Sequence, residues 1–189
     1  GNYSIEWTAL AIGDTHADPS GSDELVLSRN PETPLLDSYK VFRCCDGTSL
    51  VELGTASYIP PYTSLATGDV NASGDEEVYL LRSGMDGSQP VVALTSRNYG
   101  SDFTIQFNEL PGQTKYRQVA TGDLDGDSRA EVAVSAADDY LLYMQPESSR
   151  SYTSFPGMYD QNGILVVGDV DGPNASACGP IYLPIVLKP

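Results

Sequence analysis

Clusters of oxygen-bearing side chains are the groups in this sequence whose types and spacing suggest chemistry. The densest cluster lies in ATGDLDGDSRAEVAV, residues 120–134, where every second position from 123 onward is occupied by Asp123, Asp125, Asp127, Arg129 and Glu131. Carboxylates this close repel one another unless a positive charge lies among them. Alternate residues of a tightly curled turn point inward, so several oxygens converge. Because Ca²⁺ takes about six to eight oxygen ligands, the spacing predicts a calcium site, whereas Mg²⁺ demands stricter octahedral geometry.

Related acidic segments follow short apolar runs elsewhere in the chain. SLATGDVNASGDEEVYLL keeps the alternation with fewer charges, at Asp69, Asn71, Ser73, Asp75 and Glu77. ALAIGDTHADPSGSDELVL is two residues longer between its first and closing acids, and its candidate ligands are Asp14, His16, Asp18 and Glu24. A fourth copy, LVVGDVDGPNASACGPIYL, lacks the closing acid, so we expect no tight site there. The sequence therefore predicts two to three bound Ca²⁺ ions.

The Gly-Asp pairs of these segments recur about every fifty residues, which is typical of one four-stranded unit of a β array. The approximate repeats span residues 5–57, 58–111, 112–160 and 161–189, and the last is incomplete. Short β-branched and aromatic runs separated by turn residues predict strands and no amphipathic helix. We expect strands at 7–12, 24–28, 39–43, 50–53, 64–67, 77–82, 90–96, 103–107, 116–121, 130–136, 140–145, 152–155, 164–167 and 180–187. Segments such as EVYLL and AEVAV are apolar on both faces, so we expect sheets covered on both sides.

The pattern D-x-D-x-D-x-x-x-E after an apolar strand resembles the FG-GAP repeats of integrin α-subunit propellers and the related VCBS-type repeats of bacterial secreted proteins. The resemblance covers nearly the whole chain and rests on the second and third copies. It implies an all-β propeller of four-stranded antiparallel blades, with Ca²⁺ held between the first two strands of each blade. By position, it assigns the backbone carbonyls of Arg129 and Asp75, rather than their side chains, as ligands. It also implies a secreted or cell-surface protein.

The number of repeats differs from the resemblance, because such propellers usually have about seven blades and this chain supplies about three and a half. Three interpretations stay open. The chain is the C-terminal portion of a longer propeller, it closes as a small four-bladed ring, or two chains associate. An open array would expose apolar faces, which favours further blades from a longer chain or a second copy.

Composition and charge exclude several classes of function. A formal net charge of −16 argues against nucleic acid and anionic membrane surfaces as partners, since both attract clustered Lys and Arg. No apolar run has the length that membrane insertion needs. The sequence leaves open the disulfide state of Cys44, Cys45 and Cys178: either of the first two could pair with Cys178, the adjacent pair could form a strained bridge, or all three could be free thiols.

Two functions remain after these exclusions. The first is a calcium-stabilised propeller module for protein or glycan binding in adhesion, in which Ca²⁺ is structural. The alternative is a catalytic or non-catalytic part of a larger exported polysaccharide-active enzyme. The chain offers no convincing catalytic constellation, because its one histidine, His16, lies in an acidic segment predicted to bind metal. We therefore expect no enzymatic activity from this chain alone.

Overall fold

The computed structural model describes the parts of the chain in which the regular structure lies. These are residues 9–15, 23–28, 39–44, 50–56, 63–81, 91–94, 103–104, 116–124, 126–136, 140–144 and 152–156. All regular secondary structure in them is β-strand, and neighbouring strands pair antiparallel throughout. No helix in these ranges has the length and apolar character that crossing a membrane requires.

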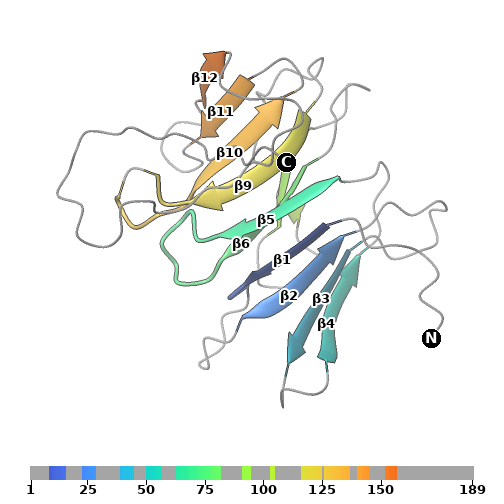
Figure 1. Ribbon diagram of the computed structural model, residues 1–189. Helices are drawn as coiled ribbons and strands as arrows, with labels where there is room; N and C mark the ends of the chain where they lie inside the picture. The colour runs from blue at the N-terminus through green and yellow to red at the C-terminus, as the bar shows by residue number, and fades with distance from the viewer. Residues whose placement is uncertain are drawn as a thin grey trace, which may run out of the picture.

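The strands form three sheets of four strands, and each sheet is built from strands that follow one another in the chain (Figure 1). The first sheet contains β1 (Ala9–Gly13), β2 (Glu24–Ser28), β3 (Tyr39–Cys44) and β4 (Leu50–Ala56). The second contains β5 (Ser64–Gly68), β6 (Glu77–Leu81), β7 (Val91–Leu94) and β8 (Phe103–Thr104). The third contains β9 (Tyr116–Gly122), β10 (Glu131–Ala136), β11 (Tyr140–Met144) and β12 (Tyr152–Pro156). Each sheet is therefore a meander whose first strand lies at one edge.

These twelve strands are the ones that the sequence predicted between residues 7 and 155. Most ends agree within two residues. The largest difference is at β4, which continues three residues beyond the predicted Leu53. Residues 95–96 and 105–107, predicted as the ends of two strands, lie outside the described residues. The strands predicted at 164–167 and 180–187, together with Cys45 and Cys178, lie outside the described residues.

The second strands of the second and third sheets are buried along their whole length. All five residues of β6 and all six of β10 are buried, so both sheets are covered on both faces, as their apolar sequences predicted. A core cluster lies between these two sheets and consists of Ala66, Val70, Tyr79, Leu81, Tyr116, Val119, Val132, Val134 and Ala136. Burying each large aliphatic side chain contributes about 1.5–3 kcal/mol relative to leaving it exposed, so this cluster is a main source of cohesion between the sheets.

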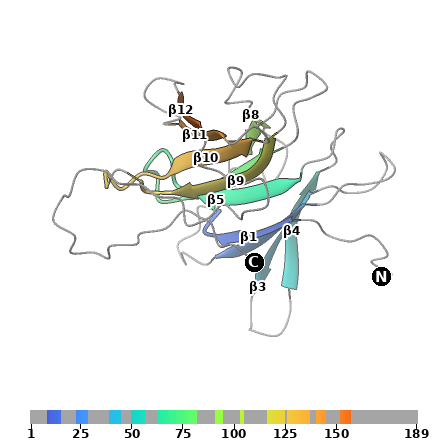
Figure 2. The ribbon, with the colours of Figure 1, turned by 45° about the horizontal axis from the view of Figure 1, so that its top comes forward.

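The first strands of the three sheets, β1, β5 and β9, lie side by side across the molecule (Figures 1 and 2). Two threonines connect them: the Thr67 hydroxyl donates to the Ile12 carbonyl at 3.1 Å, and the Thr121 hydroxyl donates to the Thr67 carbonyl. The spacing is close because Gly68 lacks a side chain. A Cβ there would lie 2.8 Å from the Thr121 Cβ and 2.9 Å from the Ala130 Cβ. The order of the first strands therefore follows the order of the repeats in the sequence.

Candidate functional site

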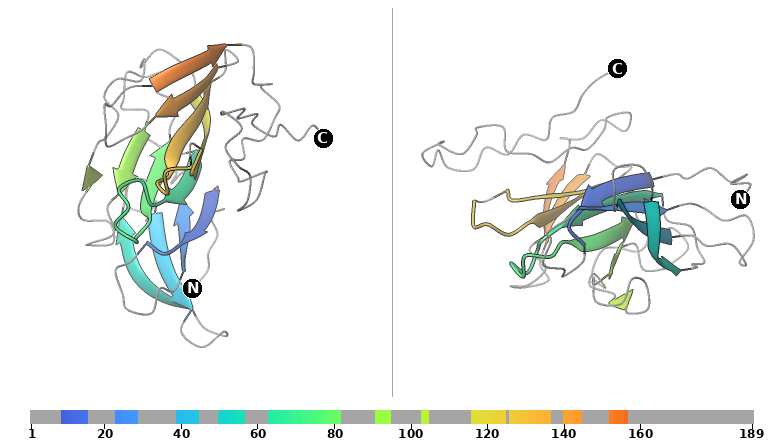
Figure 3. Two further views of the ribbon diagram at one scale, coloured as in Figure 1. Left: turned by 90° about the vertical axis from the view of Figure 1, so that its left-hand side faces the viewer. Right: turned by 90° about the horizontal axis from the view of Figure 1, so that it is seen from below.

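Each of the three first strands ends in the Gly-Asp pair from which the acidic segments begin. The turns after β5 and β9 project from the same end of the array (Figures 1 and 3). They are tied together by main-chain bonds. Ala130 N donates to the Asp69 carbonyl at 2.8 Å, and Glu76 N donates to the Asp14 carbonyl at 2.6 Å. The fold thus brings acidic turns that are about fifty residues apart in sequence into one row.

The turn after β5 is wound around the carboxylate of Asp69. Its Oδ1 accepts a hydrogen bond from Ser73 N at 3.0 Å, and its Oδ2 accepts one from Gly74 N at 2.9 Å. The Asn71 Oδ1 approaches the same Ser73 nitrogen, at 2.8 Å. The Ser73 hydroxyl accepts from Asp75 N and donates to the Asp75 carbonyl, both at 3.3 Å. Oxygens of Asp69 and Asn71, the first and third residues of the turn, therefore meet at the N–H of Ser73.

The turn after β9 is wound around Asp123 in the same way. Asp123 Oδ1 accepts from Gly126 N at 2.7 Å, and Oδ2 accepts from Ser128 N at 2.9 Å. Asp127 Oδ1 accepts from Arg129 N at 2.9 Å. Asp125, which the sequence placed between these groups, lies outside the described residues. The first acid of each described turn therefore gathers two main-chain N–H groups.

Both turns owe this shape to left-handed backbone at the same two positions. Counting from the aspartate, the fourth and sixth residues have positive φ. The values are 55° at Ala72 and 89° at Gly74 in one turn, and 81° at Gly126 and 70° at Ser128 in the other. Left-handed residues curl the chain and are costly for residues other than glycine. Two different sequences that adopt the same costly conformation indicate that the turn shape itself matters.

A buried glutamate closes each acidic segment, at the first residue of β2, β6 and β10. The exposed fractions of Glu24, Glu77 and Glu131 are 0%, 4% and 2%. Each carboxylate accepts a hydrogen bond from the backbone N–H of the residue after the Gly-Asp pair. The donors are Thr15 at 3.0 Å, Val70 at 3.1 Å and Leu124 at 2.6 Å. The same contact therefore holds all three segments against the second strand of their sheet.

Two of these glutamates also accept hydrogen bonds from side chains. The Thr15 hydroxyl donates to Glu24 Oε2 at 3.2 Å, and the side-chain amide of Asn71 donates to Glu77 Oε1. The sequence predicted the glutamates as metal ligands, and it missed these hydrogen bonds. One sequence signal could have revealed these hydrogen bonds: each glutamate follows the residue that donates the N–H by seven residues in the second and third copies and by nine in the first.

The donor chemistry of the turns fits a hard cation. The side chains of Asp69, Ser73, Asp75, Asp123 and Asp127 all offer oxygen, which Ca²⁺ prefers. Within the described ranges, no three His, Cys, Asp or Glu side chains are grouped as metal ligands. His16 and Asp18 of the first segment, like Asp125, belong to the undescribed part, whereas Asp14 is half-buried after β1. The described residues thus include the whole ligand set predicted for the second turn and part of the sets predicted for the first and third.

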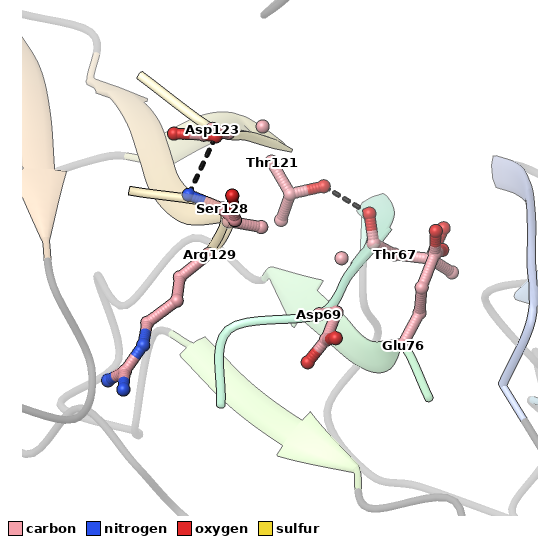
Figure 4. Close-up of a pocket in the computed structure, with 10 residues that line it drawn as sticks. Thr67, Asp69, Glu76, Thr121, Asp123, Ser128 and Arg129 are labelled. Carbon is pink, nitrogen blue, oxygen red and sulfur yellow. Dashed lines mark hydrogen bonds between the residues drawn. The ribbon is translucent and has the colours of Figure 1, made fainter. Parts of the chain in front are cut away.

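A polar hollow of about 470 Å³ lies between the second and third turns. Figure 4 shows Thr67, Asp69 and Glu76 on one side of it and Asp123, Ser128 and Arg129 on the other. Its lining includes threonine, serine, aspartate, glutamate and arginine residues beside two glycines and Ala130, so it offers both hydrogen-bond donors and acceptors. Threonine precedes Gly-Asp in both copies (ATGD), and this signal could have placed Thr67 and Thr121 at the site from the sequence.

The pKa of Glu76, one of the acids that line the hollow, is raised. Burial raises its pKa above the ordinary value of 4.5, while a hydrogen bond from Thr67 opposes that change. Repulsion from Asp23, Asp14 and Asp69 raises the pKa further. Excess negative charge therefore accumulates where the first and second sheets meet.

Comparisons with known proteins add no family assignment. No protein-family model matches the chain, and no curated protein sequence matches it.

Proposed function

We propose that the protein is a calcium-stabilised β-propeller module of the FG-GAP or VCBS type, exported from the cell, which binds a protein or glycan and catalyses no reaction. The observation that carries the proposal is the repeated turn. Three features recur after β5 and β9. An aspartate accepts hydrogen bonds from main-chain N–H groups, the fourth and sixth residues counted from it have left-handed backbone, and a buried glutamate closes the segment. Unrelated loops would have no reason to share all three features.

The charge of the turns supports a cation as the missing component. A carboxylate removed from water is costly unless it is paired, and the glutamates that close the three segments are all buried. The chain carries 26 acidic and 10 basic residues, so its own cations are too few to neutralise them. In the second turn, Asp69, Asn71, Ser73, the Asp75 carbonyl and Glu77 would hold the ion. In the third turn, the ligands would be Asp123, Asp125, Asp127, the Arg129 carbonyl and Glu131. In the first, they would come from Asp14, His16, Asp18 and Glu24.

The role of the bound ion in this proposal is structural. Calcium would supply positive charge among the carboxylates and fix each turn against its sheet. When free Ca²⁺ is about tenfold above the dissociation constant, each site stabilises the native state by about 1.4 kcal/mol. Two sites then contribute roughly 3 kcal/mol, which is a large share of a typical domain stability of about 5–15 kcal/mol.

The hollow between the turns is where we propose that a polar ligand binds. Its volume of about 470 Å³ lies within the usual range for ligand sites, and its hydroxyls, carboxylates and guanidinium match the hydroxyl groups of a sugar or a polar peptide. Calcium would act there indirectly, because Asp69 and Asp123 belong both to the turns and to the wall of the hollow.

Isothermal titration of the metal-free chain with CaCl₂ tests the metal part of the proposal. The expected result is binding of two to three Ca²⁺ ions per chain, with no comparable signal from MgCl₂. The paired variants Asp69→Ala and Asp123→Ala should each remove one site and leave the others. Absence of saturable binding at millimolar Ca²⁺ would refute it. A glycan array probed with the Ca²⁺-loaded protein then tests for a sugar ligand, with Arg129→Ala as the variant expected to lose the signal.

A further inference from the structure

The first sheet has an apolar face that points away from the second sheet. Leu10 and Ile12 on β1 are 59% and 61% exposed, and they are the exposed large hydrophobic residues among the described ones. Leu27 and Leu25 lie directly opposite them on β2, and Phe42 lies opposite Leu25 on β3. Residues directly opposite in an antiparallel pair share a face. We call these five residues the apolar face of the first sheet.

The other side of β1 is occupied by the second sheet. Gly13 lies on the opposite side of β1 from Ile12. A Cβ added to Gly13 would lie 2.6 Å from the Thr67 hydroxyl and would meet the carboxylate of Glu76, so this side of the strand faces the second sheet. Ala9 and Ala11 share that side with Gly13 because side chains alternate along a strand. The first sheet thus presents small residues to the second sheet and large apolar residues outward.

The equivalent faces of the next two sheets are covered. Leu10 lies three residues before the glycine of its Gly-Asp pair. Leu65 and Val119 hold the same position in the second and third repeats, and they are only 8% and 5% exposed. In each case the cover is the preceding sheet, since β1 contacts β5 and β5 contacts β9. The covering strand presents small residues, with Gly13 meeting Thr67 and Gly68 meeting Thr121. Leu10 thus differs from its counterparts in exposure, while its position in the repeat is the same.

We propose that the apolar face of the first sheet docks a further four-stranded repeat whose first strand presents small residues, Ala, Ser or Gly, at alternate positions. The two interfaces within the chain are built in this way, and the apolar face continues their stack by one unit. Ile12 occupies the position that Thr67 and Thr121 hold in the other two sheets. The proposed interface therefore has apolar contact at Ile12 in place of the hydrogen bond from a threonine hydroxyl to a carbonyl. Binding of calcium is not required for this inference.

A second copy of the chain fits this face less well. The small-residue strands β1 and β5 are already covered by the following sheets, so a second copy cannot present them. Pairing two apolar faces would set Leu10 and Ile12 against their own counterparts, large against large, unlike either interface within the chain. Among the described first strands, a second copy could offer only β9, whose side away from β5 includes Gln118 beside Ala120 and Gly122. A repeat with small residues at every alternate position therefore fits this face better.

The test extends the full chain by one repeat. A copy of residues 58–109 joined to Gly1 reproduces the spacing between the second and third repeats and places the small-residue strand Ser64–Gly68 before β1. Leu10→Ala is then compared in the chain and in the extended chain by thermal unfolding. It should lower the melting temperature by less than about 2 °C in the chain, where Leu10 is exposed, and by at least about 5 °C in the extended chain, where it is covered.

Two further variants make the outcome decisive. Leu65→Ala is the matched control, since Leu65 is covered in both proteins and its loss should be similar in both. Ile12→Thr should lower the melting temperature of the extended chain more than that of the original chain, because Ile12 is 61% exposed in the original chain and contributes apolar contact to the added interface. Equal effects of Leu10→Ala in the two chains would overturn the proposal, as would failure of the extended chain to unfold cooperatively when the original chain does. Sedimentation showing a dimer of the original chain that Leu10→Ala dissociates would also overturn it, in favour of a second copy.

Discussion

Replacing Glu77 tests whether the buried glutamates hold the acidic turns in place. Its carboxylate, 4% exposed, accepts from Val70 N at 3.1 Å and from the Asn71 amide. Glu77→Leu removes both acceptors and leaves the N–H of Val70, a residue only 3% exposed, without its acceptor. An unsatisfied buried donor costs about 1–3 kcal/mol. Glu77→Gln keeps one acceptor oxygen for Val70 N, so its cost should be about 0.5–1.5 kcal/mol.

Denaturation by urea at neutral pH, with EDTA present so that no metal contributes, measures both costs. The expected order of unfolding free energy is wild type, then Glu77→Gln, then Glu77→Leu. Asp127→Asn is the control, because it removes one negative charge from an exposed acid and should stay within about 0.5 kcal/mol of wild type. A Glu77→Leu protein as stable as the control would refute the reasoning, and so would equal losses in the Gln and Leu variants.

Three further substitutions test other parts of the structure. Gly68→Ala should cost about 1–3 kcal/mol, measured by urea unfolding, because its Cβ would lie 2.8 Å from the Thr121 Cβ and 2.9 Å from the Ala130 Cβ; stability equal to wild type would contradict the close approach of β5 and β9. Glu76→Gln should raise the melting temperature at pH 7, because the raised pKa means that ionising Glu76 weakens the native state as the pH climbs through that pKa. The gain should vanish below the ordinary value of 4.5, and a gain independent of pH would contradict the argument. Ser128→Gly should stabilise the protein by about 0.5–1 kcal/mol, since φ is 70° there and its N–H bond to Asp123 is kept; a loss measured by calorimetry would count against the left-handed turn.

The strands were predictable because their signals are local. β6 and β10 read EVYLL and EVAVSA, β-branched and aromatic runs bounded by Gly, Asp and Ser, and the ends of both were predicted within one residue. The end of β4 was less predictable, because strand ends depend on the partner strand: β4 pairs with β3 as far as Ala56, three residues beyond the predicted Leu53. The position of the acidic turns followed from the strands, since each begins at the Gly-Asp pair that ends a first strand.

Contacts between repeats were beyond a local reading. The hydrogen bonds from Thr67 to Ile12 and from Thr121 to Thr67 link residues 55 and 54 positions apart. Only the stacking of the first strands brings them together. The exposure of Leu10 follows the same logic, because its sequence context matches that of Leu65 and only the neighbouring sheet distinguishes them. Which faces of a sheet are covered depends on the neighbouring sheets, and the sequence of a single repeat does not determine it.

Thermal unfolding of the chain in EDTA, in millimolar Ca²⁺ and in millimolar Mg²⁺ tests the central claim most directly. Two calcium sites that each contribute about 1.4 kcal/mol should raise the melting temperature by roughly 6–11 °C in Ca²⁺, at about 2–4 °C per kcal/mol for a chain of this size. Mg²⁺ should give little of this rise. Equal melting temperatures in EDTA and in Ca²⁺ would contradict the claim that the acidic turns are structural calcium sites.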